Sequence, residues 1–195
     1  MDDTRRSQLP VKSAEVKMTN RSETDLKELE QRLRKLQRNL QLRKIEQWQR
    51  RVSFGDLLSE RNDNATQYGF GTGTTCYDNV LVLGNVRVGR NCWIGPNVVL
   101  DGRGGLVIGD WVAIGAGVQI YTHDTVEWTT SLGKASIALA STRIGDGVWV
   151  GPNTVVQMGL FIGERAVIGA MSFVNRDIPA GAKAWGVPAR IITKE

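Results

Sequence analysis

The chain has 195 residues, of which 41% are hydrophobic and 23% are charged. This length suits one domain with an extension, and the sequence contains no apolar run long enough to predict a membrane span. The first residues lack the apolar core of a signal peptide, so we expect a cytoplasmic protein. Two cysteines and one histidine favour free thiols and argue against a disulfide framework or a metal site.

The net charge of +5 is concentrated in the first part of the chain. Residues 1–51 carry a net charge of +6, whereas residues 52–195 carry −1. The basic residues are not interleaved with aromatic ones, so we expect no nucleic-acid partner. A solvated charged helix explains most of this charge, and the alternative is a weak attraction of the basic arm to an anionic membrane surface.

Three segments precede the main repeat. Residues 1–21 are polar and aperiodic, which predicts a disordered basic arm. Residues 22–52 are predicted to form a helix, and residues 53–79 an irregular connector and cap. Five leucines of the helix follow a 3–4–3–4 spacing, a seam suited to packing against a partner subunit. They are Leu26, Leu29, Leu33, Leu36 and Leu40.

A spacing of six residues dominates the chain from residue 80 to residue 179. The aliphatic residues that follow it are Val82, Val88, Ile94, Leu100, Ile108, Ile114, Ile120, Ile144, Val150, Val156, Ile162, Ile168 and Val174. The register slips by two residues at Leu106-Val107 and nowhere else. Because neither an amphipathic helix nor an alternating strand has a period of six, each repeat is interpreted as a short strand and a turn.

Three such strands close one triangular coil of 18 residues, and stacked coils bury a continuous core. The sequence therefore predicts a mainly β fold, a parallel β-helix of hexapeptide repeats with an N-terminal α-helical extension. Residues 124–143 leave the repeat as an excursion loop. Residues 180–195 form a C-terminal tail outside the period.

Several motifs of the repeat resemble those of the hexapeptide-repeat acyltransferases. They are I-Y-T-H-D at 120–124, I-G-D-G-V-W-V-G-P-N at 144–153, V-I-G-A at 167–170, V-N-R-D-I-P at 174–179 and G-V-P-A-R at 186–190. The likeness is strongest to the sugar O-acetyltransferases of polysaccharide and O-antigen biosynthesis. It implies a left-handed β-helix, a homotrimer with active sites between subunits, and acetyl-CoA as acyl donor without a metal.

His123 is the candidate catalytic residue. It lies where the chain leaves the repeat, and a neutral imidazole can accept a proton near neutral pH. An acceptor hydroxyl needs such a base as it attacks a thioester carbonyl. The group that orients His123 remains open among Asp101, Asp124 and a backbone carbonyl.

The resemblance also implies a site for CoA in the groove between neighbouring subunits. Ala170 would contact the pantetheine arm through its backbone, and Arg190 would meet a phosphate of the nucleotide end. Asn175 and Arg176 stand where the family commonly has Thr-Lys. The remaining cofactor candidates, for which packing or solvation is the plainer interpretation, are Trp149, Lys183 and Trp185.

The acceptor site departs from the family pattern. Relatives acting on galactosides or maltose hold the sugar with an Asn and an Asp before the histidine, and the matching positions here are Gly95 and Arg103. This difference counts against a free disaccharide held in that manner. The acceptor candidates that remain are Asn97, Asp101, Asp124 and, in the excursion loop, Trp128.

The predicted function is transfer of acetyl to a hydroxyl of a sugar in a surface polysaccharide or its lipid- or nucleotide-linked precursor. One alternative is N-acetylation of a nucleotide-linked amino sugar, and another is an antibiotic-modifying acetyltransferase. A third is a non-enzymatic β-helix scaffold whose leucine seam docks a partner. A γ-type carbonic anhydrase shares the fold but needs three histidines for zinc, and this chain has one.

Overall fold

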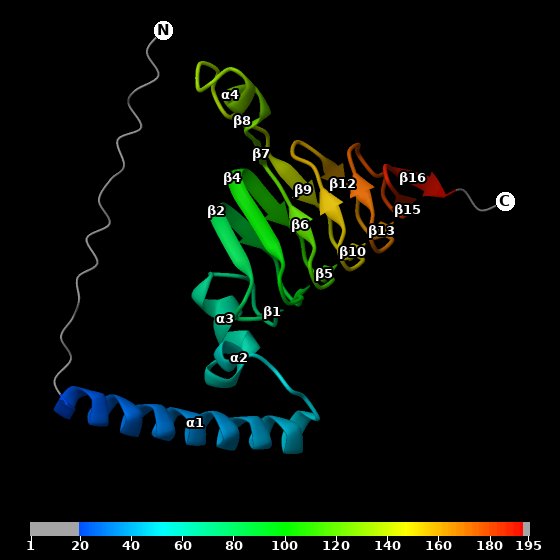
Figure 1. The fold of residues 1–195 in the computed structure, drawn as a ribbon. Coiled ribbons are helices and arrows are strands. Elements are labelled where there is room, and N and C mark those ends of the chain that lie inside the picture. The colour runs from blue at the N-terminus through cyan, green and yellow to red at the C-terminus, as the bar shows by residue number, and fades with distance from the viewer. Residues whose placement is uncertain (1–19, 193–195) are drawn as a thin grey trace, which may run out of the picture. The chain divides into compact units, whose positions relative to one another are not determined.

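The computed structural model describes residues 20–192, which divide into two compact units between Arg51 and Val52 (Figure 1). In the first unit, α1 (Asn20–Trp48) is a single helix, and it therefore begins and ends earlier than the predicted range of 22–52. It ends where Gln49 adopts a φ of 53° and its N–H donates to the carbonyl of Ile45 at 2.8 Å.

The leucine seam of α1 is solvent-exposed within this unit. Leu26, Leu29, Leu33 and Leu36 are each between 44% and 49% exposed. The predicted disordered arm, with its proposed membrane attraction, falls mainly on residues 1–19, outside the described residues. Within residues 20–192, none of the helices has the length and apolar character needed to cross a membrane.

The connector before the repeat is not irregular throughout, which corrects the prediction for residues 53–79. It contains α2 (Phe54–Leu58) and α3 (Arg61–Gln67). The side chain of Ser53 caps α2 by accepting a hydrogen bond from the N–H of Asp56. Helices of five and seven residues are too short to give a periodic pattern in the sequence, so the sequence did not reveal them.

The β-helix begins before residue 80. Strand β1 (Thr75–Cys76) pairs with the next coil, and Cys76 lies opposite Ile94. Phe70, six residues before Cys76, is also buried, so the period of six reaches back to Phe70. Its first two members are an aromatic residue and a cysteine, which a search for aliphatic residues does not detect.

Two parallel sheets make up most of the β-helix. The first contains, in spatial order, β1, β3 (Trp93–Ile94), β5 (Ala113–Ile114), β10 (Trp149–Val150), β13 (Val167–Ile168), β15 (Lys183–Gly186) and β16 (Ala189–Ile192). The second contains β12 (Phe161–Ile162), β9 (Thr142–Ile144), β4 (Val99–Ile108), β6 (Gln119–Ile120), β11 (Val155–Val156) and β14 (Phe173–Val174), with β2 (Leu81–Val88) paired to β4.

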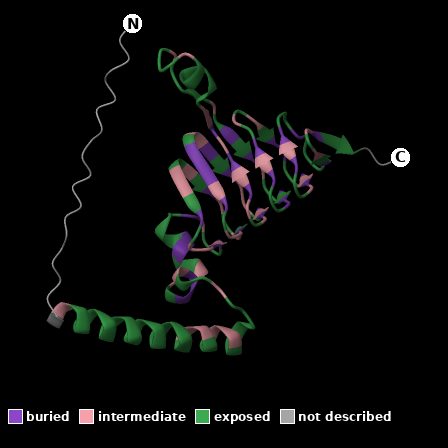
Figure 2. Ribbon diagram, in the orientation of Figure 1, coloured by how far each residue is buried: buried purple, intermediate pink, exposed green. Residues whose placement is uncertain are grey.

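The inward positions of the repeat form the core (Figure 2). From Ile94 to Val174, every aliphatic residue of the period is at most 3% exposed. Polar residues at inward positions are small and hydrogen-bonded: the hydroxyls of Thr154 and Ser172 both donate to the carbonyl of Gly169, at 3.0 and 2.7 Å. The predicted fold class, a mainly β parallel β-helix with an N-terminal helix, is therefore confirmed.

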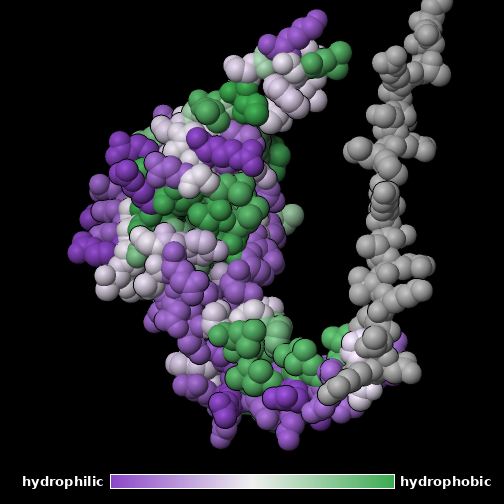
Figure 3. Space-filling view, turned by 90° about the vertical axis from the view of Figure 1, so that its left-hand side faces the viewer, coloured by the Kyte–Doolittle hydropathy of each residue, from purple (hydrophilic) through white to green (hydrophobic). Residues whose placement is uncertain are grey.

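The ends of the stack differ from each other. At the start, β2 leaves Leu81 50% exposed, and a hydrophobic area covers this end in Figure 3. At the other end, the tail predicted to lie outside the repeat adds two strands to the first sheet. Ala184 of β15 lies opposite Ile168, and β16 folds back antiparallel on β15. Figure 1 shows this hairpin at the end of the β-helix remote from α3.

Candidate active site

The candidate site is built on an irregularity between β2 and β4. The two strands run in register up to the pair Gly84 and Gly102, and they resume at Val86 and Leu106. Between these points β4 has two more residues than β2, which explains the slip seen in the sequence. The three residues between Gly102 and Leu106, Arg103-Gly104-Gly105, form a bulge opposite the single Asn85, and Gly105 in it has a φ of 95°.

The bulge is held against the segment that precedes His123. The N–H of Gly104 donates to the hydroxyl of Thr122 at 2.8 Å, and that hydroxyl lies 2.8 Å from the carbonyl of Asp101. A methyl group on Gly104 would lie 2.3 Å from the carbonyl oxygen of Thr122. Glycine at this position therefore permits the close approach that brings Asp101 and Arg103 up to His123.

Asp101 is fully buried and binds His123 directly. Its Oδ2 lies 2.6 Å from Nδ1 of His123 and accepts a second hydrogen bond from the N–H of Thr122 at 2.8 Å. Its Oδ1 accepts from the N–H of Arg103 at 3.3 Å. Asp101 is thus the group that orients His123, one of the three possibilities that the sequence left open.

The ionisation of Asp101 is set by two opposing effects. Burial opposes the charged form and would raise the pKa of this carboxyl group. The hydrogen bond from His123 and those from the N–H groups of Thr122 and Arg103 act in the other direction. Their combined effect is larger, so the pKa of Asp101 lies below its usual value and the group is an anion at neutral pH.

Arg103 determines which tautomer of His123 is present. One of its guanidinium nitrogens, Nη1, lies 3.2 Å from Nε2 of His123. A guanidinium can only donate hydrogen bonds, so Nε2 must accept with its lone pair. The proton of the neutral ring is therefore on Nδ1, where it is donated to Asp101. The result is an imidazole whose Nε2 is free of a proton and faces outward from the buried carboxylate.

The excursion after His123 is a small folded structure. Strand β7 (His123–Asp124) pairs antiparallel with β8 (Ala138–Leu139), and α4 (Val126–Thr130) lies between them. Its chain returns to the coil where the N–H of Ala140 donates to the carbonyl of Thr122 at 3.0 Å. Figure 1 shows this excursion projecting from the β-helix beyond β7. His123 thus lies at the base of the excursion, beside the corner of the coil.

The other acceptor candidates do not contact His123. The carboxylate of Asp124 accepts from the N–H of Val126 at 2.6 Å, which makes it a local turn residue at the start of α4. Asn97 lies at the preceding corner of the coil, where its side chain accepts a hydrogen bond from Asn79 at 2.8 Å. Trp128 belongs to α4 and is 46% exposed.

The cofactor candidates divide among three places on the chain. Trp149, Lys183 and Trp185 occupy outward positions of the first sheet, and Arg190 lies opposite Trp185 in the final hairpin. The peptide of Ala170 belongs to the corner that follows this sheet. The exposed Asn175 and Arg176 lie at another corner, directly after Val174. Val174 is stacked on Val156, and Val156 on Ile120, so the segment after Ile120 that contains His123 lies at the same corner of the β-helix.

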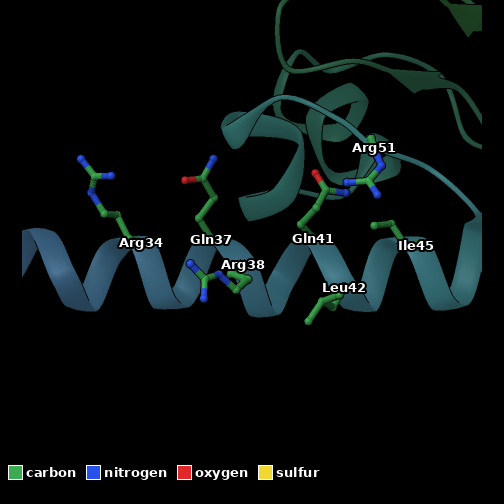
Figure 4. A pocket seen from close by; sticks show the side chains of 7 residues that line it. All are labelled: Arg34, Gln37, Arg38, Gln41, Leu42, Ile45 and Arg51. Carbon is green, nitrogen blue, oxygen red and sulfur yellow. The ribbon is translucent and has the colours of Figure 1, made fainter.

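A groove of about 360 Å³ lies on the first unit (Figure 4). Its lining residues are Arg34, Gln37, Arg38, Gln41, Leu42, Ile45 and Arg51. None of the predicted site residues belongs to it, and its lining contains no histidine, carboxylate or thiol that could act as a base or nucleophile. This groove therefore offers no general base or nucleophile, whereas the corner at His123 does.

Sequence reasoning gave Arg103 no role at the base, and it did not single out Thr122. The signal for Arg103 was the slip of two residues in the repeat. An insertion in a parallel coil must form a bulge, and a bulge redirects its side chains away from the regular surface. The slip therefore marks the position where a polar residue can approach the base.

Comparison with known proteins agrees with the β-helix fold. Residues 85–122 and 141–176 match the family model described as the hexapeptide repeat of succinyl-transferase. The chain is 35% identical over 109 residues to the galactoside O-acetyltransferase of Escherichia coli, covering 55% of this chain and 53% of that protein. It is 40% identical over 108 residues to nodulation protein L of Rhizobium meliloti, covering 55% and 58%. The chain thus spans about half the length of the curated relatives it matches.

A solved structure covers more of the chain. The hexapeptide-repeat acetyltransferase of Vibrio cholerae, in complex with acetyl-CoA, is 29% identical and superimposes with a TM-score of 0.61. The match covers 84% of this chain and 87% of that protein. With the repeat model and the sequence relatives, it shows that this chain is similar to hexapeptide-repeat acetyltransferases, and that the likeness extends over most of the fold.

Proposed function

We propose that this chain is an acetyltransferase that moves acetyl from acetyl-CoA to a hydroxyl of a sugar in a surface polysaccharide or its precursor. The observation that carries the proposal is the hydrogen-bonded series of Asp101 and His123, which leaves Nε2 unprotonated, with the guanidinium of the half-exposed Arg103 as its neighbour. The galactoside O-acetyltransferase among the relatives supports a sugar hydroxyl, and the acetyl-CoA complex of the Vibrio protein supports the donor.

The arrangement is suited to direct transfer with His123 as general base. The acceptor hydroxyl gives its proton to Nε2 while its oxygen forms a bond to the acetyl carbonyl carbon. The resulting tetrahedral intermediate collapses, the carbon–sulfur bond breaks, and the proton on Nε2 passes to the CoA thiolate. Asp101 keeps Nδ1 protonated throughout and stabilises the imidazolium that forms between the two steps.

We further propose that the enzyme is a homotrimer with its active sites between subunits. On one subunit, the cofactor candidates of the first sheet and those at the His123 corner face different directions. A groove between two neighbouring subunits could be lined by the sheet face of one and the corner of the other. CoA bound there would meet Arg190 or Lys183 with its phosphates while its thioester approaches His123.

Replacement of His123 tests the proposal. The His123→Ala variant is expected to lose at least about 10²-fold in kcat, the usual contribution of a general base. Acetyl-CoA binding by calorimetry should be close to that of the wild type. The thermal transition should fall, because the buried carboxylate of Asp101 loses one of its hydrogen bonds, but the variant should remain folded since Thr122 and Arg103 still donate to it. Activity is measured by release of the CoA thiol in the presence of a sugar acceptor.

The outcome has two parts that can be separated. A His123→Ala variant with a wild-type rate would exclude His123 as the base. A wild-type protein that does not bind acetyl-CoA at all would exclude the acetyltransferase function and favour a β-helix scaffold.

A further inference from the structure

Arg103 carries a positive charge that its neighbours neutralise only in part. Its side chain is 48% exposed, and its Nε lies 3.7 Å from Oδ1 of Asp101. Asp101 is also the partner of His123, so it is shared between the two. Arg90 provides a contrast, because its guanidinium binds the carboxylate of Asp110 at 2.7 and 3.1 Å. Within residues 20–192, Asp101 is the only carboxylate within 4 Å of the Arg103 guanidinium.

The position of Arg103 matters more than its exposure. A hydroxyl that is to lose its proton must approach Nε2 of His123 to about 3 Å. Nη1 of Arg103 is already 3.2 Å from that nitrogen. Any acceptor that reaches the base must therefore displace the guanidinium slightly or bind beside it. In both cases the substituents next to the reacting hydroxyl meet a cation.

The positive charge of Arg103 favours an anion at that place. When Nε2 takes up the acceptor proton, the imidazolium and the oxyanion of the tetrahedral intermediate form together, so the net charge does not change. Arg103 must then share its only carboxylate, Asp101, with a charged His123. A carboxylate or phosphate on the acceptor would give the planar guanidinium a partner of its own through two hydrogen bonds. A neutral acceptor would displace the guanidinium from Nε2 without providing a charged group that could replace this interaction.

The adjoining surface carries charge of the same sign. Val107, on the strand that follows the bulge, is paired with Arg87 on one side and Arg143 on the other, and all three are exposed. Neither arginine forms an ion pair with another described residue. These arginines extend the positive surface across neighbouring strands, as a binding surface for an acidic polymer would require.

We propose that the acceptor is an anionic sugar, with a carboxylate or phosphate next to the hydroxyl that is acetylated, and that Arg103 is the residue that selects it. This inference rests on the proposed acetyltransfer and narrows its substrate class. The two sources of negative charge, a uronate-type carboxylate and a phosphodiester, present similar oxygens to a guanidinium and are separated by experiment.

The test compares acceptors that differ only in charge. Thiol release from acetyl-CoA is measured with a neutral hexose oligomer, the matching uronate oligomer, its methyl ester, and the hexose oligomer linked by phosphodiesters. We expect kcat/KM on one of the charged acceptors to exceed that on the neutral oligomer by about tenfold or more, the effect of one charge-assisted contact. If the uronate is preferred, its methyl ester should behave as the neutral oligomer does.

Variants connect this preference with Arg103. Arg103→Gln should raise KM for the preferred acceptor about tenfold while KM for acetyl-CoA stays unchanged. Arg103→Lys should recover part of the loss. The matched control is Arg165→Asn, which removes an exposed charge at a remote turn where the backbone φ of 57° accommodates asparagine. It should retain the wild-type preference.

Three results would overturn the inference. They are equal kcat/KM on neutral and charged acceptors, an Arg103→Gln variant that loses kcat equally on all acceptors, and acetyl-CoA binding without turnover of any charged acceptor. In each case acetyl-CoA binding would still support the proposed donor. Failure to bind acetyl-CoA would instead contradict the proposed function itself.

Discussion

The regular coils at residues 144–174 and the corner formed by residues 101–105 and 121–141 are made from the same chain but obey different constraints. In the regular coils, the inward polar residues are neutral hydroxyls that bind a backbone carbonyl, as Thr154 and Ser172 do. At the corner, the inward polar residue is the charged Asp101, which needs hydrogen bonds from Thr122, His123 and Arg103. The charged side chain is buried where the repeat is broken, because the bulge and the start of the excursion supply the donors that it needs.

This difference indicates where a β-helix can hold the charged side chains that catalysis needs. An unpaired buried carboxylate would cost several kcal/mol, so it persists only where the chain supplies donors for it. The bulge supplies the N–H and guanidinium of Arg103, and the start of the excursion supplies Thr122 and His123. The regular coils on either side hold these two irregular segments in fixed positions.

The contrast between the regular coils and the corner is tested most strongly by removing the charge of Asp101. We expect Asp101→Asn to lower kcat about 10²-fold or more, because an amide can hold His123 in the wrong tautomer and cannot stabilise the imidazolium. Acetyl-CoA binding should be unchanged. Steady-state kinetics and calorimetry on the purified variant give both quantities, and a kcat near that of the wild type would exclude Asp101 from the mechanism.

The same variant tests how the stability of the fold depends on pH. Because the folded protein holds the pKa of Asp101 below its usual value of about 4, ionised Asp101 stabilises the fold above that pH and loses this effect as the pH falls through the lowered value. The difference in Tm between wild type and Asp101→Asn should therefore narrow below about pH 4. A constant difference from pH 7 to pH 3 would contradict the linkage.

A smaller effect is expected when the bulge is distorted and its charges are kept. A methyl group on Gly104 would lie 2.3 Å from the carbonyl oxygen of Thr122 and 2.9 Å from the N–H nitrogen of Ala140. Gly104→Ala must therefore move the bulge, and we expect a loss of kcat/KM of about tenfold or more, since a displacement of 1 Å at a reacting site can cost 10²-fold.

The matched control for Gly104→Ala lies in a regular coil. Ile168→Ala removes a fully buried side chain and should lower the free energy of unfolding by about 2–5 kcal/mol, with kcat of the folded protein nearly unchanged. Thermal unfolding and kinetics are measured on both variants. If Gly104→Ala kept full activity, the bulge would not position the site.

The extent to which the sequence predicts this molecule follows from the same distinction. The coils were predictable because burial repeats every six residues, and His123 was recognisable because it interrupts that repeat. The partnership of Asp101 with His123 was not decided, because it depends on the stacking of coils 22 residues apart. The contact of Arg103 with His123 was not predicted. The repeat pattern shows that two residues are inserted near Arg103, but it does not show in which direction the inserted segment and its side chains turn.

The smallest expected effect concerns the two thiols, which lie in the regular part of the repeat. Burial raises the pKa of Cys76 to about 11, and burial likewise raises the pKa of Cys92. Both side chains are fully buried, and Sγ of Cys92 lies 3.1 Å from the carbonyl of Gly109. At that pKa about 0.1% of Cys76 is thiolate at pH 8, and thiolate is the reactive form. We therefore expect no labelling by a disulfide reagent in the native protein and labelling of both thiols in denaturant. Rapid labelling of the native protein would show that the regular coils open. It would contradict the view that they are a rigid support for the corner that contains His123.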